Sequence, residues 1–464
     1  MAAGDSRRNA RRLPRWTSHH YGHAYRQRSL HRRSNSRGDS RRGRRTCRYE
    51  RRTRRGRRDS RCRRDSRGRG RSDSRSRSRR SRRSRRSRSD SSGSRDGDDI
   101  KHFPWNQGMR LGDTRGKNRY EVLSLMGDGT FGRCLKCRPS IGGHDIAVKV
   151  IRDVARYVES AKIETAILRD ICRADPGGSS RCVHLLDDFM HKGKWYCLAF
   201  EPLSSSLYDY LKGNDYRGFW MTDIQAIAAD ILTGLDFCRG LQLTHTDLKT
   251  ENVLFSVEDF AYTSFPREST RKSRPYKRPG CASVKLIDFG NATYAKEHHT
   301  RIINTRQYRG PEVILGSRSN RVAWDEQSDM WSTACILAEC FTGNLFFQCT
   351  DEDVEHLKLM EVALGVFPPL MLKESSPQVV NEHFEINYGS SRMPMHTVRW
   401  GSSSQRSGGK AIRRQQTPGG LVEGRPEYRH FAELLEECFR YQPECRPTPA
   451  QALGHPFFQC QFQD

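Results

Sequence analysis

Short runs of β-branched and aromatic residues alternate with turn residues between positions 120 and 200, a pattern typical of an antiparallel sheet. The runs lie at 120–125, 131–137, 145–151, 185–190 and 195–200. Between them, residues 158–171 place apolar side chains at helical spacing, with one face formed by Ala161, Ile163, Ala166, Ile167 and Ile171. This part of the chain therefore predicts a small sheet-rich lobe that contains one main helix.

Helical periodicity dominates after position 207. It predicts helices at 222–238, 328–341, 351–364 and 429–439. Two further segments, near 260–283 and 389–424, are rich in Arg, Lys, Ser, Pro or Gly, and we expect both to be surface loops. The predicted fold class is α+β, with a small antiparallel-sheet lobe followed by a larger helical lobe.

The first 100 residues differ from the rest in composition. They contain 37 Arg, no Lys and 10 Asp plus Glu, a net charge of +27, whereas the whole chain carries +29. Because such a segment has few aliphatic side chains to bury, we expect a disordered Arg/Ser-rich tail over 1–100 and a linker over 101–119. Clustered Arg favours a nuclear localisation signal, so we expect a nuclear protein, with a cytoplasmic pool as an alternative. The same charge predicts nonspecific, salt-dependent RNA binding.

No run of about 18 apolar residues occurs, and no apolar stretch follows Met1. We therefore expect neither a membrane-spanning helix nor a secretory signal, and we expect a monomer without a membrane partner. The 15 Cys residues are odd in number and scattered, which favours reduced thiols in the cytosol or nucleus. Cys134 and Cys137 form a CxxC pair, but no second pair follows to complete a zinc site.

A glycine-rich turn lies between two predicted strands and contains Gly127, Gly129 and Gly132. Glycines in such a turn let the backbone close over a phosphate, although a plain hairpin turn has the same composition. Lys149 ends the next apolar strand, and Glu164 lies on the helix that follows. A strand and a helix in this order suit an ion pair that orients the ammonium toward phosphates, whereas an isolated Lys at a strand edge extends to solvent.

Two loops carry the candidate catalytic groups. Asp247 and Asn252 lie five residues apart in the loop 245–252, and Asp288 precedes Phe289 and Gly290 directly after an apolar run. Two carboxylates and a carboxamide near one point can hold Mg²⁺ and accept a proton from a hydroxyl group.

Taken in order, these motifs resemble the signature of the protein kinases. The resemblance implies that the ATP phosphates lie under a loop formed by Met126, Gly127, Asp128, Gly129, Thr130, Phe131, Gly132, Arg133 and Cys134. It implies further ATP contacts from Ala147, Lys149, Glu164, Phe200, Glu201, Leu203 and Asp209. Phe200, Glu201 and Leu203 match the hinge that binds adenine, and Asp209 matches the position near the ribose.

The same resemblance implies the catalytic roles. Asp247 is the expected catalytic base, Lys249 is expected to neutralise the γ-phosphate, and Asn252 and Asp288 are expected to hold Mg²⁺. ATP and Mg²⁺ are the implied cofactors. Structural roles are implied for Asp329, Glu312 and Arg446, the last two as a pair.

Four segments, at 244–247, 297–300, 328–332 and 355–361, narrow the resemblance to the LAMMER, or CDC-like, kinases of the CMGC group. The likeness covers 120–458, with a small lobe at 120–203 and a large lobe at 204–458. The motif that names the family is degenerate here at Lys358, Leu359 and Val362. The usual Val, Pro and Gly of the family are replaced by Cys134, Thr250 and Ala334.

The resemblance implies a dual-specificity protein kinase that uses Mg-ATP to phosphorylate Ser and Thr on Arg/Ser-rich splicing factors, with some Tyr autophosphorylation. Such an enzyme regulates pre-mRNA splicing. Two alternatives stay open: another CMGC kinase, of the SR-protein-specific or the dual-specificity tyrosine-regulated type, and an RNA-processing scaffold with an inert kinase fold. Intact Lys149, Asp247, Asn252 and Asp288 weigh against the scaffold.

Overall fold

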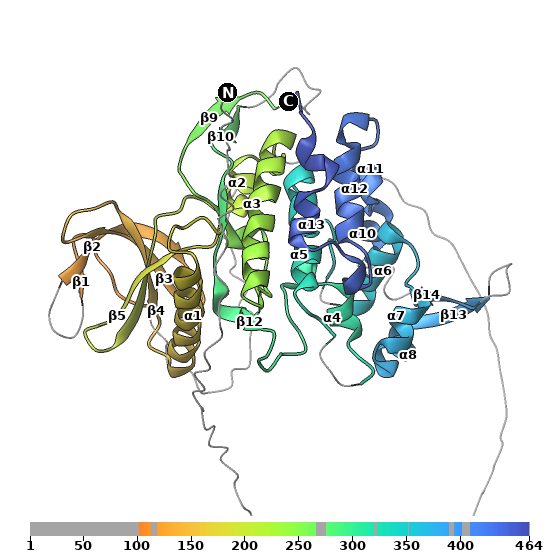
Figure 1. The fold of residues 1–464 in the computed structure, drawn as a ribbon, viewed down its shortest axis with the longest axis horizontal. Coiled ribbons are helices and arrows are strands. Elements are labelled where there is room, and N and C mark those ends of the chain that lie inside the picture. Colours follow the sequence, from red (N-terminus) through yellow and green to blue (C-terminus); the bar gives the residue numbers. More distant parts are fainter. Residues whose placement is uncertain are drawn as a thin grey trace, which may run out of the picture. The chain divides into compact units, whose positions relative to one another are not determined.

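The computed structural model describes residues 102–112, 118–265, 275–319, 323–350, 352–388, 394–400 and 409–463. The Arg/Ser-rich segment 1–100, with its predicted disorder, lies outside the described residues. The described chain folds into a sheet with one long helix and a larger body of helices (Figure 1). The predicted two-lobed α+β fold is therefore confirmed.

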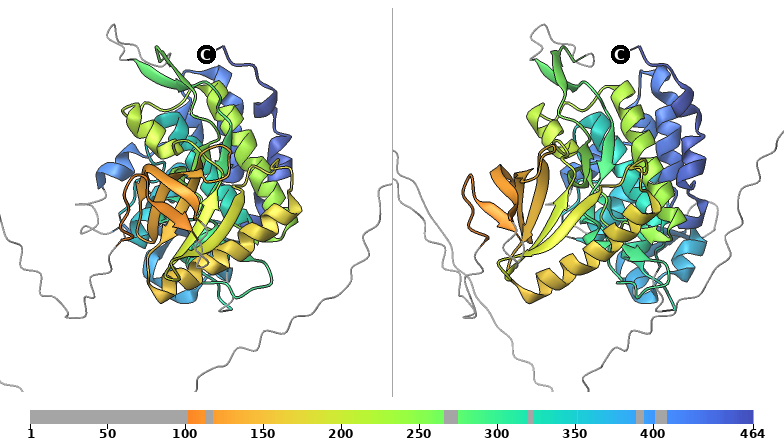
Figure 2. Two further views of the ribbon diagram at one scale, coloured as in Figure 1. Left: turned by 90° about the vertical axis from the view of Figure 1, so that its left-hand side faces the viewer. Right: turned by 60° about the vertical axis from the view of Figure 1, so that its left-hand side comes forward.

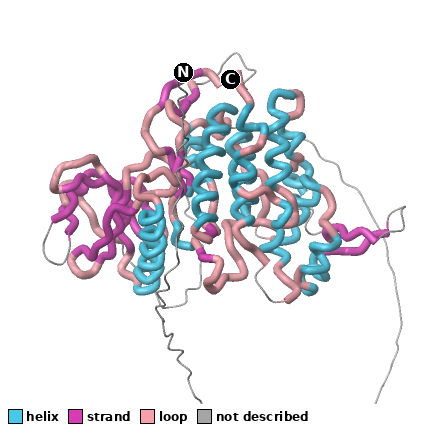
Figure 3. The backbone as a smooth tube through the Cα atoms, in the orientation of Figure 1, coloured by secondary structure: helices cyan, strands magenta, loops and turns pink. Residues whose placement is uncertain are grey.

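The small lobe is a six-stranded antiparallel sheet. Its strands run in the order β1 (Arg110–Gly112), β2 (Asn118–Asp128), β3 (Gly132–Pro139), β4 (Ile146–Ile151), β6 (Trp195–Phe200) and β5 (Leu185–His191). One cluster of buried side chains holds the sheet together and includes Val122, Leu135, Val148 and Cys197. Figure 3 shows the strands of this sheet in magenta.

Helix α1 (Ala155–Ala174) packs against the sheet of the small lobe, as Figure 2 shows. Its buried residues include Leu168 and Ile171, which join the core that continues into the large lobe. Ile163, predicted on the buried face, is 57% exposed, whereas its neighbour Glu164 is buried. The helix is therefore rotated so that a carboxylate, not an isoleucine, faces the interior.

The large lobe is built around α5 (Gln327–Thr342), whose residues from Gln327 to Phe341 are all buried. Beside it runs α3 (Met221–Gly240) (Figure 1). The further helices are α2 (Leu207–Gly213), α4 (Pro311–Leu315), α6 (Asp353–Leu364), α7 (Pro369–Glu374), α8 (Pro377–His383), α10 (Gly409–Arg414), α11 (Pro418–Leu421), α12 (Arg429–Cys438) and α13 (Pro449–Leu453). The four helices predicted from periodicity correspond to α3, α5, α6 and α12. Among the described helices, none combines the length and the apolar composition that a membrane span requires.

Two short antiparallel pairs hold the loops that carry the predicted catalytic residues. β7 (Leu243–Thr244) pairs with β12 (Thr293–Tyr294), and β8 (Val253–Phe255) pairs with β11 (Val284–Leu286). The loop 245–252 connects β7 to β8, and the loop 287–292 connects β11 to β12. The pairing therefore places the two loops side by side.

Where segment 260–283 is described, it forms a hairpin and not an irregular loop. β9 (Phe260–Thr263) pairs with β10 (Tyr276–Pro279). Tyr276 is buried with Trp220 and Phe265, and Arg278 forms an ion pair with Asp223 of α3. In the segment 389–424, the described residues form the end of the β13 (Phe384–Tyr388) and β14 (Pro394–Val398) pair, followed by α10 and α11. Aromatic burial and side-chain pairing, which local composition does not indicate, attach the hairpin to the large lobe.

The predicted linker 101–119 contributes to the small lobe where it is described. Leu111 of β1 pairs with Tyr120 of β2. Phe103 is 3% exposed, and its ring contacts the rings of His191 and Trp195. The small lobe thus includes residues before position 120, because isolated apolar side chains find partners on the sheet that no local pattern predicts.

Candidate active site

A cleft of about 830 Å³ is bordered by the sheet, the connection between the lobes and the large lobe. Met126, Gly127 and Cys134 line it from the small lobe, together with Lys136 and Ile146. Across from them the lining residues are Pro202, Leu203, Ser204, Ser205, Ser206, Tyr208, Asp209, Glu251, Leu254, Ser256, Val257, Glu258 and Ile287. The cleft therefore brings together five residues predicted to contact ATP: Met126, Gly127, Cys134, Leu203 and Asp209.

The glycine-rich turn between β2 and β3 is closed by a hydrogen bond from the Gly129 nitrogen to the Gly132 oxygen, at 2.9 Å. A Cβ atom at position 132 would lie 2.3 Å from the Val150 carbonyl oxygen, so this position requires glycine. Thr130 and Phe131 form the exposed tip of the turn. The turn therefore approaches β4 closely while its tip stays open to solvent.

The side chains of three residues predicted to bind ATP, Asp128, Arg133 and Ala147, make contacts within the small lobe. Arg133 Nη2 donates to Asp128 Oδ2 at 3.0 Å, and this hydrogen bond from Arg133 lowers the pKa of Asp128. Ala147 is buried on β4. Asp128 and Arg133 thus shape the turn through their contact with each other.

The ammonium of Lys149 lies between two carboxylates. Its Nζ atom is 3.0 Å from Glu164 Oε2 and 3.4 Å from Asp288 Oδ1. Burial opposes the charged form, but the charges of Glu164 and Asp288 together raise the pKa of Lys149. Burial also opposes ionisation of Asp288, yet the nearby Lys149 charge keeps the pKa of Asp288 below its usual value. β4, α1 and the loop 287–292 therefore meet at one network of charges.

The Asp247 carboxylate holds two other residues. Lys249 Nζ donates to Oδ2 at 2.7 Å, while Thr305 donates to Oδ1 through its hydroxyl at 2.8 Å and its backbone nitrogen at 3.1 Å. Lys249 Nζ also donates to the Thr305 hydroxyl oxygen at 3.1 Å. Thr305 is 58 residues away in the sequence, so only the tertiary structure shows that it belongs to the site.

Asn252 and Asp288 present oxygen atoms that suit Mg²⁺. The Asn252 amide nitrogen donates to the Asp247 carbonyl oxygen at 2.9 Å, which leaves the amide oxygen as an acceptor. Carboxylate and amide oxygens, supplemented by phosphate and water, are ligands that Mg²⁺ accepts. The residues therefore fit the metal, and the charged Lys149 beside the glycine-rich turn fits the phosphates of ATP.

Asp329 anchors the loop that carries Asp247. Its buried carboxylate accepts hydrogen bonds from the backbone nitrogens of His245 at 2.7 Å and Thr246 at 3.0 Å. Burial raises the pKa of Asp329 to about 6. Thr246 takes a left-handed backbone conformation, with φ of 66°, which few residues other than glycine adopt. The carboxylate of Asp329 therefore holds the loop in a conformation that its sequence alone does not favour.

In the connection between the lobes, the Glu201 carboxylate has protein partners of its own. It accepts hydrogen bonds from Lys285 Nζ at 2.7 and 2.8 Å and from the His184 backbone nitrogen at 2.8 Å. Phe200 pairs with Ala147 of β4 and ends β6. The Glu201 side chain, predicted among the ATP-binding residues, is thus a structural group that ties the connection to β11.

Glu312 and Arg446 form a buried bidentate ion pair, with nitrogen–oxygen distances of 2.8 and 2.7 Å. Ser328 of α5 donates to the same carboxylate at 2.9 Å. Arg446 also donates to the carbonyl oxygens of Gln327 and Tyr441. The pair expected from the sequence is therefore present, and it joins α4 to α5 and to the segment after α12.

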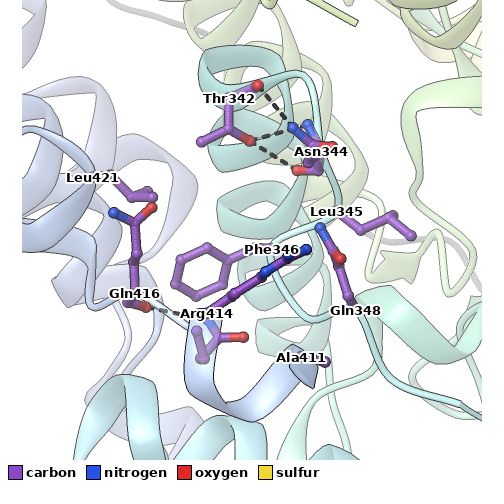
Figure 4. Close-up of a pocket in the computed structure, with 10 residues that line it drawn as sticks. Thr342, Asn344, Leu345, Phe346, Gln348, Ala411, Arg414, Gln416 and Leu421 are labelled. Atoms are coloured by element: carbon purple, nitrogen blue, oxygen red, sulfur yellow. Dashed lines mark hydrogen bonds between the residues drawn. The ribbon is translucent and has the colours of Figure 1, made fainter. Parts of the chain in front are cut away.

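A second hollow, of about 330 Å³, lies in the large lobe between the chain after α5 and helix α10 (Figure 4). The Thr342 hydroxyl donates to the Asn344 carbonyl oxygen at 2.9 Å, and Phe346, Arg414 and Gln416 complete much of the lining. Its lining residues are distinct from those of the cleft beside Lys149. We therefore assign it no part in the active site.

Comparison with known proteins identifies the class to which this fold and site belong. The pattern of the protein kinase domain matches residues 120–458. A crystal structure of a kinase domain superposes with a TM-score of 0.66 at 36% sequence identity, covering 78% of this chain and 100% of that one. The chain therefore belongs to the protein kinase family.

Within this family, the similar proteins include kinases named for dual specificity. The chain is 34% identical over 345 residues to dual specificity protein kinase CLK2 of Mus musculus and 35% identical over 342 residues to dual specificity protein kinase lkh1 of Schizosaccharomyces pombe. These matches cover 74% of this chain in both cases, and 64% and 47% of the two relatives. Serine/threonine-protein kinase AFC2 of Arabidopsis thaliana is 36% identical over 346 residues, covering 73% of this chain and 77% of the relative. The chain thus spans less than two-thirds of the length of the mouse relative.

Proposed function

We propose that the protein is a Mg-ATP-dependent protein kinase of dual specificity, which transfers the γ-phosphate to Ser, Thr and Tyr hydroxyl groups. The observation that carries this proposal is the convergence of Lys149, Glu164 and Asp288 in one network of charges beside the nucleotide-sized cleft. An inert scaffold has no need of a charged, partly exposed ammonium held by two carboxylates. The relatives named as dual specificity kinases support the range of acceptor residues.

In this proposal each polar group has a distinct task. Asp247 accepts the proton of the substrate hydroxyl, and Lys249 and Thr305 keep its carboxylate oriented. Lys149, positioned by Glu164, binds the phosphates as a cation. Asn252 and Asp288 would hold Mg²⁺, which would supply positive charge to the phosphates. Phosphoryl transfer requires positioning and charge neutralisation above all, and these residues supply both.

We propose Arg/Ser-rich splicing factors as the protein substrates, and regulation of pre-mRNA splicing in the nucleus as the role. The similarity to the dual specificity kinases CLK2 and lkh1 supports a kinase of that family. Two carboxylates at the cleft, Glu251 and Glu258, offer complementary charge to Arg side chains. The chain itself begins with an Arg/Ser-rich segment, which supports nuclear targeting and nonspecific RNA binding.

The test is transfer of radiolabelled phosphate from ATP to two peptides, one rich in Arg and Ser and one with a Ser followed by Pro. We expect the wild-type protein to prefer the Arg/Ser peptide and the Asp247→Asn variant to lose transfer to both. Absence of transfer by the wild-type protein would favour the inert scaffold. A preference for the Pro-directed peptide would instead favour another CMGC kinase type.

A further inference from the structure

His102 contacts Asp128 in the glycine-rich turn 127–132 and Arg152, which follows β4. Its Nδ1 atom is 2.8 Å from Asp128 Oδ1, and its Nε2 atom contacts the guanidinium of Arg152. The same guanidinium donates to the Gly129 carbonyl oxygen at 3.4 Å. The Nδ1 contact with Asp128 is an ion-pair distance and not a hydrogen bond, because Nδ1 has no hydrogen-bond partner among the described residues. His102 therefore contacts two residues, Asp128 and Arg152, that each contact or belong to the turn.

Arg133 supplies a second connection between this segment and the turn. Its Nη1 atom donates to the Phe103 carbonyl oxygen at 2.8 Å, while Nε and Nη2 donate to Asp128 Oδ2 at 3.1 and 3.0 Å. One oxygen of the Asp128 carboxylate thus faces His102, and the other binds Arg133. The turn is held from both sides through a single carboxylate.

The segment itself is fixed to the rigid part of the small lobe. Phe103 is buried in the same cluster as Leu135 and Val148, which lie on β3 and β4. Its ring meets those of His191 and Trp195 edge-on, with centroids 5.7 and 5.2 Å apart. A side chain buried in this way resists displacement, so the backbone next to it can serve as a fixed point.

We propose that His102 and Phe103 form a clamp that positions the glycine-rich turn over the phosphates of ATP, with His102 as a positioning residue that acts through Asp128. This role rests on the proposed function, because the turn must bind a nucleotide for its position to matter. His102 is separated by one residue from the Arg/Ser-rich segment 1–100, so the clamp lies where that segment joins the kinase domain.

Steady-state kinetics of the full-length protein test the clamp. We expect His102→Ala to raise the KM for ATP at least about fivefold, with kcat and the thermal midpoint close to those of the wild type. The matched control is His144→Ala, an exposed histidine between β3 and β4 of the same lobe, which should leave both constants unchanged.

A double-mutant cycle tests the route of the effect. In the Asp128→Asn background, His102→Ala should cause little further rise in KM, because the two residues act through one contact. Additive effects of the two substitutions would overturn the proposed route through Asp128. An unchanged KM in His102→Ala, or a fall in kcat together with the thermal midpoint, would overturn the positioning role.

Hydrogen exchange of the backbone amides at 127–132 gives a readout that needs no catalysis. We expect faster exchange in His102→Ala than in the wild type and in His144→Ala, because the turn loses its external support. A wild-type protein that neither binds ATP nor transfers phosphate would refute the proposed function, while the exchange rates would still report whether His102 holds the turn. Equal exchange in all three proteins would overturn the clamp whatever the activity.

Discussion

The hydroxyl oxygens of Thr250 and Tyr308 lie 3.2 Å apart inside the large lobe, although the residues are 58 positions apart in the sequence. Tyr308 also donates to Glu339 Oε2 of α5 at 2.7 Å. Burial raises the pKa of Glu339 to about 7 and also raises the pKa of Tyr308. Because Thr250 stands where the family usually carries Pro, this chain has a hydroxyl contact that Pro cannot make.

Removing each of the two hydroxyl groups in this network should lower the free energy of unfolding by a different amount. Tyr308→Phe should lower the free energy of unfolding by about 1–3 kcal/mol, because the buried Glu339 loses its donor. Thr250→Val should cost less, since Tyr308 keeps its bond to Glu339. Urea denaturation of both variants checks the order, and a larger loss for Thr250→Val would show that Glu339 is not the main partner of Tyr308.

Removing a charge from the phosphate site should impair chemistry far more than folding. Lys149→Met and Asp288→Ala should each lower kcat by at least about a hundredfold, since phosphoryl transfer depends on positioning and charge neutralisation. The thermal midpoint should change little for Asp288→Ala, whose side chain is 38% exposed, and should fall more for Lys149→Met, because the buried Glu164 carboxylate then loses its cation. Steady-state kinetics and differential scanning calorimetry make the comparison. Turnover near the wild-type rate in either variant would contradict the assigned site.

At the buried ion pair of Glu312 and Arg446, we expect a substitution to reduce the stability of the fold. Arg446→Met leaves the Glu312 carboxylate buried without its cation, which should cost about 3–5 kcal/mol of unfolding free energy. Adding Glu312→Leu should recover part of this loss, because no uncompensated charge then remains. Chemical denaturation of the single and double variants checks this. A double variant less stable than Arg446→Met would show that hydrogen bonding by Glu312 matters more than its charge.

His356 on α6 predicts a pH dependence of stability. Its ring is fully buried, neither ring nitrogen has a hydrogen-bond partner among the described residues, and burial lowers its pKa to about 3. Between pH 6.5 and 3 the unfolded chain binds a proton at this residue and the folded chain does not. The free energy of unfolding should therefore fall with decreasing pH, by at most about 1.4 kcal/mol per pH unit from this residue.

Replacing the ring isolates this contribution. His356→Leu should lower the slope of unfolding free energy against pH relative to the wild type between about 6 and 4, while the exposed control His144→Ala should keep the wild-type slope. Urea denaturation at several pH values measures both slopes. Identical slopes in His356→Leu and the wild type would mean that the folded protein can protonate this histidine.

The resemblance to protein kinases implies that Thr246 stands where most of them carry an Arg that binds an activation-loop phosphate. A threonine has no cation to offer, and here its hydroxyl donates to the Asn291 carbonyl oxygen at 2.7 Å. We therefore expect full activity without an upstream activating kinase. When this protein is expressed in bacteria and treated with phosphatase, it should phosphorylate the Arg/Ser peptide without a lag. A lag that disappears only after phosphorylation between residues 288 and 312 would refute this.

Local sequence was sufficient for the architecture and for the order of the motifs. Strand and helix periodicity predicts most elements, because each pattern reports which side of a short segment is apolar. The glycine-rich turn, Lys149, Asp247 and Asp288 are also local signals, since each is identified by its immediate neighbours. These local features are sufficient to predict the two-lobed kinase fold without knowledge of any contact between them.

Tertiary structure alone decided which groups face one another. The rotation of α1 that buries Glu164 and exposes Ile163 places the carboxylate beside Lys149 of β4, and periodicity within one helix cannot contain that partner. Thr305 reaches Asp247 from a distant segment, and Phe103 and Tyr276 are buried in segments whose composition is typical of linkers and loops. Such contacts depend on the packing of remote segments, and their free energy exists only once the chain has folded.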